Sequence, residues 1–231
     1  MVRNINKVQT IAYALREVKE QVVFIGGSVA ELYADYPDLV DIRPTIDVDC
    51  LIDLQIVTYL DYSKLENYLR TLGFQNDISE NAPICRKIYH GILVDFIPIN
   101  PNILGFSNFW YKDGVKNKIN VSLPDGTSIF IMPVEYYIAT KLEAMNSRGG
   151  RDIRGSHDWE DIVFILDNCS RFLNNVKQCN NLKLKNYLKE SFVNLLNNNN
   201  IKEIIYTALP YSSEEENVNK IFTLMNDVVI N

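Results

Sequence analysis

The chain has 231 residues, which fits one large domain or a domain with an appendage, and its apolar content of 47% is ordinary for a globular protein. A formal net charge of -6 argues against a protein that coats nucleic acid broadly, because such coating needs a basic surface. A local basic patch stays possible. The four cysteines have neither CxxC spacing nor companion histidines, which argues against a zinc site or a disulfide framework and fits a cytoplasmic protein.

Neither the N-terminal residues nor any later stretch contains the apolar run that a signal peptide or a membrane-spanning helix needs. We therefore expect a protein that is neither secreted nor embedded in a membrane.

An amphipathic helix is predicted over residues 6–21, followed by a short apolar strand over residues 22–25. The strand stops at Gly26, Gly27 and Ser28, after which apolar residues resume at helical spacing. This pattern predicts a strand, a tight turn and a helix. Glycines allow a ligand to approach the backbone, and the first N–H groups of a helix attract anions, so phosphate is the expected ligand.

Alternation over residues 45–52 predicts a strand from which Asp47 and Asp49 project to the same side. Two carboxylates this close repel each other unless a cation lies between them, and Mg²⁺ suits such oxygen ligands. Each motif has a plainer interpretation. A lone Gly-Gly-Ser is usually a turn, and an alternating Asp pair is often a solvated strand face.

A third carboxylate, Asp95, interrupts the apolar strand predicted over residues 92–97. Burying it without a partner would be costly, and the plainer alternative is an edge strand on which Asp95 faces water. His90 and Gly91 predict a hairpin turn between this strand and residues 84–89. Arg86 in the preceding strand could contact a substrate, although a cross-strand partner for a carboxylate is the commoner role.

Residues 110–118 are aromatic and basic, and they could hold a nucleotide or an RNA end, although a solvated loop is the favoured interpretation. A second hairpin is expected around residues 124–127, followed by a helix that begins after Pro133. On this helix Lys141 and Arg148 are seven residues apart and so lie near one face, where both could reach a common anion. Salt bridges are the alternative for each.

Residues 148–155 form a basic, glycine-containing loop, which suits either a triphosphate or a plain connection. Ser156 can cap the next helix, whose first turn carries Asp158 and Asp161. Beyond residue 168 the composition shifts to asparagine, lysine and leucine, and the pattern predicts three helices with a polar break at residues 197–200.

Taken together, Gly26, Gly27 and Ser28, then Asp47 and Asp49, then Asp95 resemble the signature of the polymerase β superfamily of nucleotidyltransferases. Three further stretches are similar to its AbiEii-like branch of abortive-infection and toxin–antitoxin enzymes: residues 43–49, 141–144 and 156–162. The resemblance covers roughly residues 20–167.

The resemblance implies an α+β fold, with a mixed nucleotidyltransferase sheet flanked by helices over residues 1–132 and a helical domain over residues 133–231 that completes the nucleotide site. It implies a cytoplasmic enzyme that transfers a nucleoside monophosphate from an NTP, such as ATP, to a hydroxyl acceptor. The acceptor would be an RNA, such as tRNA, or a protein, and a cognate antitoxin is a possible partner. The alternatives are a small-molecule (aminoglycoside-like) nucleotidyltransferase and a non-catalytic nucleotide-binding module.

The implied site has two parts. Mg²⁺, or Mn²⁺ in its place, would be held by the catalytic carboxylates of Asp47, Asp49 and Asp95. The nucleotide would be bound by residues from both domains: Gly26, Gly27, Ser28, Lys141, Arg148 and Asp158. The family has a functional acidic position near the start of the helix after Ser156, and we assign it to Asp158 rather than Asp161.

Overall fold

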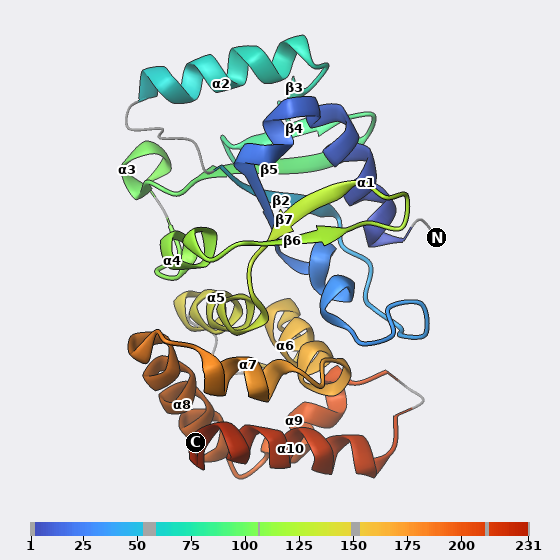
Figure 1. Ribbon diagram of the computed structural model, residues 1–231, viewed down its shortest axis with the longest axis vertical. Coiled ribbons are helices and arrows are strands. Elements are labelled where there is room, and N and C mark those ends of the chain that lie inside the picture. The colour runs from blue at the N-terminus through green and yellow to red at the C-terminus, as the bar shows by residue number, and fades with distance from the viewer. Residues whose placement is uncertain (1–2, 53–58, 106, 149–152, 211–212, 231) are drawn as a thin grey trace. The chain divides into compact units, whose positions relative to one another are not determined.

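The computed structural model describes residues 3–52, 59–105, 107–148, 153–210 and 213–230 (Figure 1). It divides into two compact units, the first comprising Met1–Val29 and Arg43–Pro133 and the second Ala30–Ile42 and Val134–Asn231. The expected α+β class is confirmed, with a mixed sheet flanked by helices. The sequence-based division after residue 132 lies close to that between Pro133 and Val134, but it assigned residues 30–42 to the first domain.

Among its described residues, the first unit contains a seven-stranded sheet with the strand order β3-β4-β5-β2-β1-β7-β6. Its strands are β1 (Val22–Ile25), β2 (Asp47–Ile52), β3 (Gln75–Asn76), β4 (Arg86–Tyr89), β5 (Ile92–Pro98), β6 (Ile119–Ser122) and β7 (Ser128–Ile131). β2 is antiparallel to β1 and parallel to β5, and β1 is also parallel to β7. The three strands that carry the predicted motifs, β1, β2 and β5, are therefore central neighbours.

The hairpin between β4 and β5 turns at the two predicted residues. His90 and Gly91 both have positive φ angles, 48° and 80°, and the flanking Tyr89 and Ile92 are paired. Positive φ at both central residues is the mark of a type I′ turn, whose twist matches that of the strands. This turn fixes the register of β4 on β5, and thereby sets Arg86 opposite Asp95.

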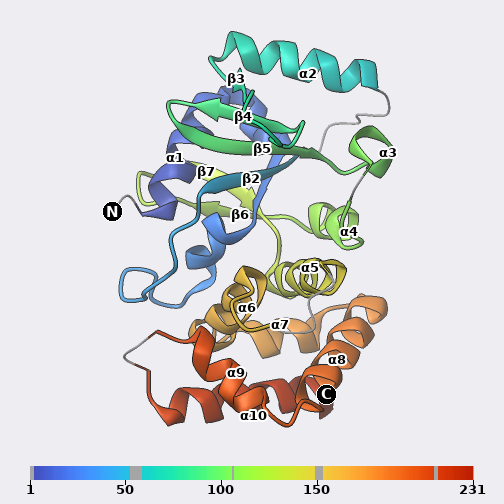
Figure 2. The ribbon, with the colours of Figure 1, turned by 180° about the vertical axis from the view of Figure 1, so that it is seen from behind.

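The first unit's helices are α1 (Asn4–Leu15), η1 (Arg16–Gln21), α2 (Tyr59–Thr71), α3 (Pro101–Leu104) and α4 (Tyr111–Lys116), and η2 (Gly27–Tyr33) leads into the second unit. α1 lies over one face of the sheet (Figures 1 and 2). The helix expected over residues 6–21 ends instead at Leu15, because Arg16 takes a φ of 51° and a 3₁₀ turn follows. The segment after the glycine turn is also a 3₁₀ helix, with Val29 N–H donating to the Gly26 carbonyl.

The second unit is helical over its described C-terminal residues: α5 (Val134–Ser147), α6 (His157–Asn168), α7 (Phe172–Gln178), α8 (Leu182–Leu196), α9 (Ile201–Ala208) and α10 (Glu215–Ile230). Trp159 of α6 is fully buried and donates from Nε1 to the carbonyl of Ile204 in α9 at 3.2 Å. Beyond residue 168 the described residues form four helices rather than the three expected. The seven residues of α7 bury only Phe172 and Val176, too little periodicity to be read from the sequence.

Across the described residues, no helix is both long and apolar enough to cross a membrane.

Candidate metal centre

Three carboxylates from two neighbouring strands converge in the first unit. Asp49 of β2 is in register with Asp95 of β5, and Asp47 precedes Asp49 by two residues on the same strand. Each of the three can offer an oxygen that lies within 4.8 Å of the other two. Alternation predicted that Asp47 and Asp49 share a side. The parallel pairing of β2 with β5 adds the third carboxylate.

The plainer alternative for Asp95, an edge strand on which it faces water, is wrong. β5 lies between β4 and β2, and Asp95 is 7% exposed. Asp47 and Asp49 are half-buried. The cluster therefore has one oxygen donor set into the sheet and two nearer to solvent, an arrangement that leaves an approach for a bound ion or substrate.

Arg86 supplies the counter-charge, because its guanidinium bridges two of the three carboxylates. Nε and Nη2 donate to the two oxygens of Asp95, each at 2.8 Å, and Nη2 also donates to Asp47 Oδ2 at 2.7 Å. The hydrogen bonds to Asp95 outweigh burial, and with the negative charges nearby they raise the pKa of Arg86 above its ordinary value. Arg86 therefore takes the cross-strand role that the sequence favoured.

The glycine turn is fitted to the carboxylate cluster. Ile25, the last residue of β1, is in register with Asp49, and Gly26 follows with a φ of +74°. A Cβ on Gly26 would lie 2.1 Å from Asp49 Oδ2, closer than real Cβ atoms approach. Only glycine therefore lets the turn and the Asp49 carboxylate occupy these positions together. Gly26 is needed for the cluster whether or not the turn binds a phosphate.

The two residues after Gly26 are buried in this structure. Gly27 opens η2, and the hydroxyl of Ser28 donates to the Ile25 carbonyl at 3.3 Å. Ser28 is 1% exposed, so its hydroxyl closes the turn from within. Gly26 itself is half-buried, so its backbone is the part of the turn that a ligand can reach.

The donor set suits a divalent cation. Three carboxylates face one guanidinium in this cluster, so the four side chains together carry a net negative charge. Carboxylate oxygens are the ligands that Mg²⁺ and Mn²⁺ prefer, and a cation among them would relieve their mutual repulsion. Asp47, Asp49 and Asp95 could thus bind a metal ion, as the sequence predicted.

The predicted nucleotide contacts Lys141, Arg148 and Asp158 belong to the second unit. Lys141 and Arg148 do reach a common anion, and that anion is Asp158: Lys141 Nζ lies 3.2 Å from Oδ1 and Arg148 Nη1 lies 2.7 Å from Oδ2. Lys141 Nζ also lies 2.7 Å from Asp161 Oδ2. The salt-bridge alternative therefore describes these contacts, in which Asp158 pairs with both Lys141 and Arg148 and Asp161 pairs with Lys141. Residues 149–152 of the adjoining basic loop lie outside the described residues.

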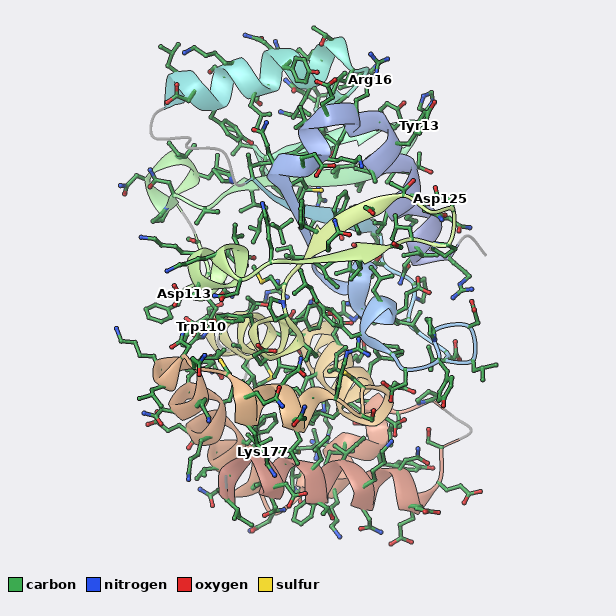
Figure 3. All side chains as sticks on the ribbon, viewed as in Figure 1. Tyr13, Arg16, Trp110, Asp113, Asp125 and Lys177 are labelled. Carbon is green, nitrogen blue, oxygen red and sulfur yellow. The ribbon has the colours of Figure 1, made fainter. Side chains whose placement is uncertain are left out.

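The aromatic and basic segment is a short helix rather than the favoured loop. Trp110 is 2% exposed at the start of α4, which Figure 3 marks with Trp110 and Asp113. Phe109, by contrast, is 68% exposed, and Lys112 and Lys116 are exposed as well. Lys112 and Lys116 have the i, i+4 spacing of one helix face, and Phe109 lies just before the helix. Phe109 lies outside the segment predicted over residues 110–118, although it is an aromatic residue directly beside it.

A scan of protein-family models finds no match to this chain, and none of the curated proteins is significantly similar to it.

Proposed function

We propose that the protein is a metal-dependent nucleotidyltransferase that transfers a nucleoside monophosphate from an NTP to a hydroxyl acceptor. The observation that carries the proposal is the convergence of Asp47, Asp49 and Asp95 on adjacent strands, directly beside the turn at Gly26. A cation site bordered by a backbone turn that suits phosphate is what transfer from a nucleoside triphosphate requires.

In this reaction the acceptor oxygen forms a bond to the α-phosphorus while the bond from that phosphorus to the pyrophosphate oxygen breaks. The acceptor hydroxyl gives its proton to water or to a carboxylate of the cluster, and pyrophosphate leaves. A cation held by the three carboxylates would neutralise the charge that develops on the phosphate oxygens. Both oxygens of Asp95 accept hydrogen bonds from Arg86, so Asp95 would hold the cation through the lone pairs that these bonds leave.

The backbone around Gly26 would hold the triphosphate, and the buried Gly27 and Ser28 would fix the shape of the turn. In this structure the side chains of Lys141 and Arg148 both pair with Asp158. They could bind a nucleotide only if its phosphate oxygens replaced Asp158 as their partner. We therefore place these three residues second to the carboxylate cluster in the proposal.

The exposed side chains at α4 favour an RNA end as the acceptor. The ring of Phe109, just before the helix, can stack on a base, and the ammonium groups of Lys112 and Lys116 can reach the adjacent phosphates. α4 leads into β6, which is separated from β2 by β7 and β1. One row of paired residues crosses these four strands: Ile119 of β6, Ile131 of β7, Phe24 of β1 and Cys50 of β2. At about 4.8 Å per strand, this row spans about 14 Å, a distance that a few nucleotides cover.

The acceptor proposal has its own test. Replacing Lys112 and Lys116 by glutamine should weaken binding of a labelled single-stranded RNA and lower its salt dependence, because two phosphate contacts are lost. The control makes the same charge change at Lys183 and Lys189, exposed residues of α8. Equal RNA binding by the two double variants in a fluorescence-anisotropy titration would remove α4 from the acceptor site.

The reaction is tested by incubating the protein with Mg²⁺, each α-labelled NTP and total RNA, followed by a gel. We expect label in RNA, and its loss in Asp47→Asn and Asp49→Asn variants that keep the far-ultraviolet circular dichroism of the parent. Label on protein would identify a protein acceptor, and label only on an added aminoglycoside would identify the small-molecule class. Full activity in both variants would refute the proposal.

A toxin role for this enzyme predicts growth arrest when the chain is expressed, relieved by Asp47→Asn. Such an enzyme would be paired with a cognate antitoxin.

A non-catalytic nucleotide-binding module is the second candidate, and the ion pairs of Arg86 favour it. A guanidinium can satisfy Asp47 and Asp95 without any metal. This candidate predicts NTP binding that chelation of divalent ions leaves unchanged, with no label transferred to any acceptor.

A further inference from the structure

The guanidinium of Arg86 contacts carboxylate oxygens that a cation bound by the cluster would use as ligands. Its Nη2 atom donates to Asp47 Oδ2 at 2.7 Å and to Asp95 Oδ2 at 2.8 Å, so one nitrogen holds oxygens from two of the three carboxylates. A divalent ion that used the same oxygens would lie close to a positive charge. Cation binding and the contact between Arg86 and Asp47 therefore oppose each other.

The two contacts of Arg86 differ in how easily they can be exchanged. Asp95 is the cross-strand partner of Arg86, and it accepts hydrogen bonds from both Nε and Nη2. Asp47 accepts from Nη2 alone, and its side chain is 31% exposed, against 10% for that of Asp95. The bidentate contact anchors the guanidinium to β5. The contact with Asp47 is the one that can be given up.

We propose that Arg86 is an exchangeable counter-ion of the carboxylate cluster. In the metal-free protein it holds Asp47 and Asp95. A divalent cation takes Asp47 from it, and the guanidinium, still anchored to Asp95, then binds an anionic oxygen of the triphosphate. This inference rests on the proposed function and adds a regulatory consequence: the nucleotide favours metal binding because it gives Arg86 a new partner.

The physical basis is a coupling of charges within one site. A guanidinium beside a divalent cation raises the free energy of the metal-bound state, whereas the same guanidinium lowers the free energy of the metal-free cluster by relieving carboxylate repulsion. A triphosphate reverses the first effect, since its oxygens can contact Arg86 and the cation together. By thermodynamic reciprocity, metal and nucleotide each strengthen the binding of the other.

The test uses the full chain and two separate binding measurements. Mn²⁺ binding is measured alone by calorimetry, and binding of α,β-methylene-ATP, which resists α-phosphate transfer, is measured at fixed excess Mn²⁺. Arg86→Gln should bind Mn²⁺ about tenfold more tightly, the order expected when a unit charge beside a divalent ion is removed. The same variant should bind the nucleotide analogue about tenfold more weakly, because a charge-assisted hydrogen bond is lost.

Arg70→Gln is the matched control. Arg70 is exposed on α2, where it donates to Asn67 Oδ1 at 3.1 Å, and its replacement changes the net charge of the chain equally. We expect both affinities to stay within about twofold of the parent's, since Arg70 contacts a residue of its own helix and salt screens an exposed charge. Arg86→Lys keeps the charge and loses the bidentate fork, so it should fold and show smaller changes of the same signs.

Opposite changes in the two affinities support the exchange, because a damaged site would weaken both. Weaker binding of both ligands by Arg86→Gln and by Arg86→Lys would overturn it and leave Arg86 as a residue that only orients the carboxylates. Unchanged affinities would overturn it as well. If the parent binds Mn²⁺ and Asp49→Asn does not, the metal centre stands whatever Arg86 does. If neither the parent nor Arg86→Gln binds Mn²⁺, both proposals fail.

Discussion

The substitution Gly26→Ala tests how closely the glycine turn and the carboxylate cluster depend on each other. Gly26 has a φ of +74°, and a Cβ there would lie 2.1 Å from Oδ2, 3.0 Å from Cγ and 3.3 Å from Cβ of Asp49. The methyl group cannot be accommodated unless the Asp49 carboxylate leaves its position. We therefore expect one small change to disturb both the backbone and the metal ligand.

The size of each effect can be separated with a second glycine. An alanine held in the left-handed region costs about 1–2 kcal/mol. Gly91→Ala should show this cost alone, because Gly91 has a φ of +80° and a Cβ there would meet nothing within 4 Å. Gly26→Ala should cost about 1 kcal/mol more in free energy of unfolding, the order of forcing a side chain out of its rotamer.

Urea unfolding and Mn²⁺ calorimetry measure the two consequences. We expect Gly91→Ala to keep the Mn²⁺ affinity of the parent and Gly26→Ala to lose at least about tenfold, since one of three carboxylates is displaced. When Asp49 is replaced by alanine, most of the extra cost at Gly26 should disappear, because Oδ2 and Cγ have gone and only the Cβ at 3.3 Å remains. Equal Mn²⁺ binding by Gly26→Ala and Gly91→Ala would refute this reasoning.

Three further predictions concern buried charges and thiols. Lys141→Gln should lower the free energy of unfolding by about 3 kcal/mol, because it removes the buried partner of Asp161; a change below about 1 kcal/mol by urea unfolding would contradict this. Burial raises the pKa of Glu135 above its ordinary value of 4.5, so its neutral form suits the fold and its stabilising effect is lost as the pH rises through the raised pKa. The gain in free energy of unfolding from Glu135→Gln, measured against the parent, should therefore be larger at pH 8 than at pH 4. An equal gain at both pH values would contradict this. Burial raises the pKa of Cys85 to about 12, and in a folded-state alkylation at pH 8 we expect Cys179, which is partly exposed, to react first, as mass spectrometry of the peptides would show.

Local patterns were enough to predict the parts of the fold that depend on neighbouring residues. The alternation around Asp47 and Asp49, the turn at His90 and Gly91 and the cap at Ser156 each appear in the structure as expected. In each of them the deciding interactions span a few residues, so the periodicity of the side chains carries the information. The contact of Arg86 with Asp95 belongs with them, because the turn sets the pairing of the two strands.

Long-range packing decided what the sequence could not show. Nothing local to Asp47 indicates that β2 pairs with β5, more than forty residues later. Trp110 is 2% exposed although it begins a basic segment, and α4 meets a distant part of the chain: a Cβ on Gly114 would lie 2.6 Å from Met132 Sδ, beyond the end of β7. Likewise, Lys141 was expected to face a nucleotide, yet its carboxylate partners come from the next helix.

Exposure distinguishes the two ionic clusters, although the sequence presents them alike. Lys141 and Asp161 have side chains 10% and 1% exposed, so their pair is closed to solvent. Arg86 and Asp47 have side chains 19% and 31% exposed. Exchanging a partner in the closed pair would leave a buried charge, at a cost of several kcal/mol, whereas water can solvate either member of the open pair during exchange. A role that requires counter-ions to be replaced by a metal and a triphosphate is therefore better placed at Arg86 and Asp47 than at Lys141, and the opposite changes expected on replacing Arg86 are the measurement that decides it.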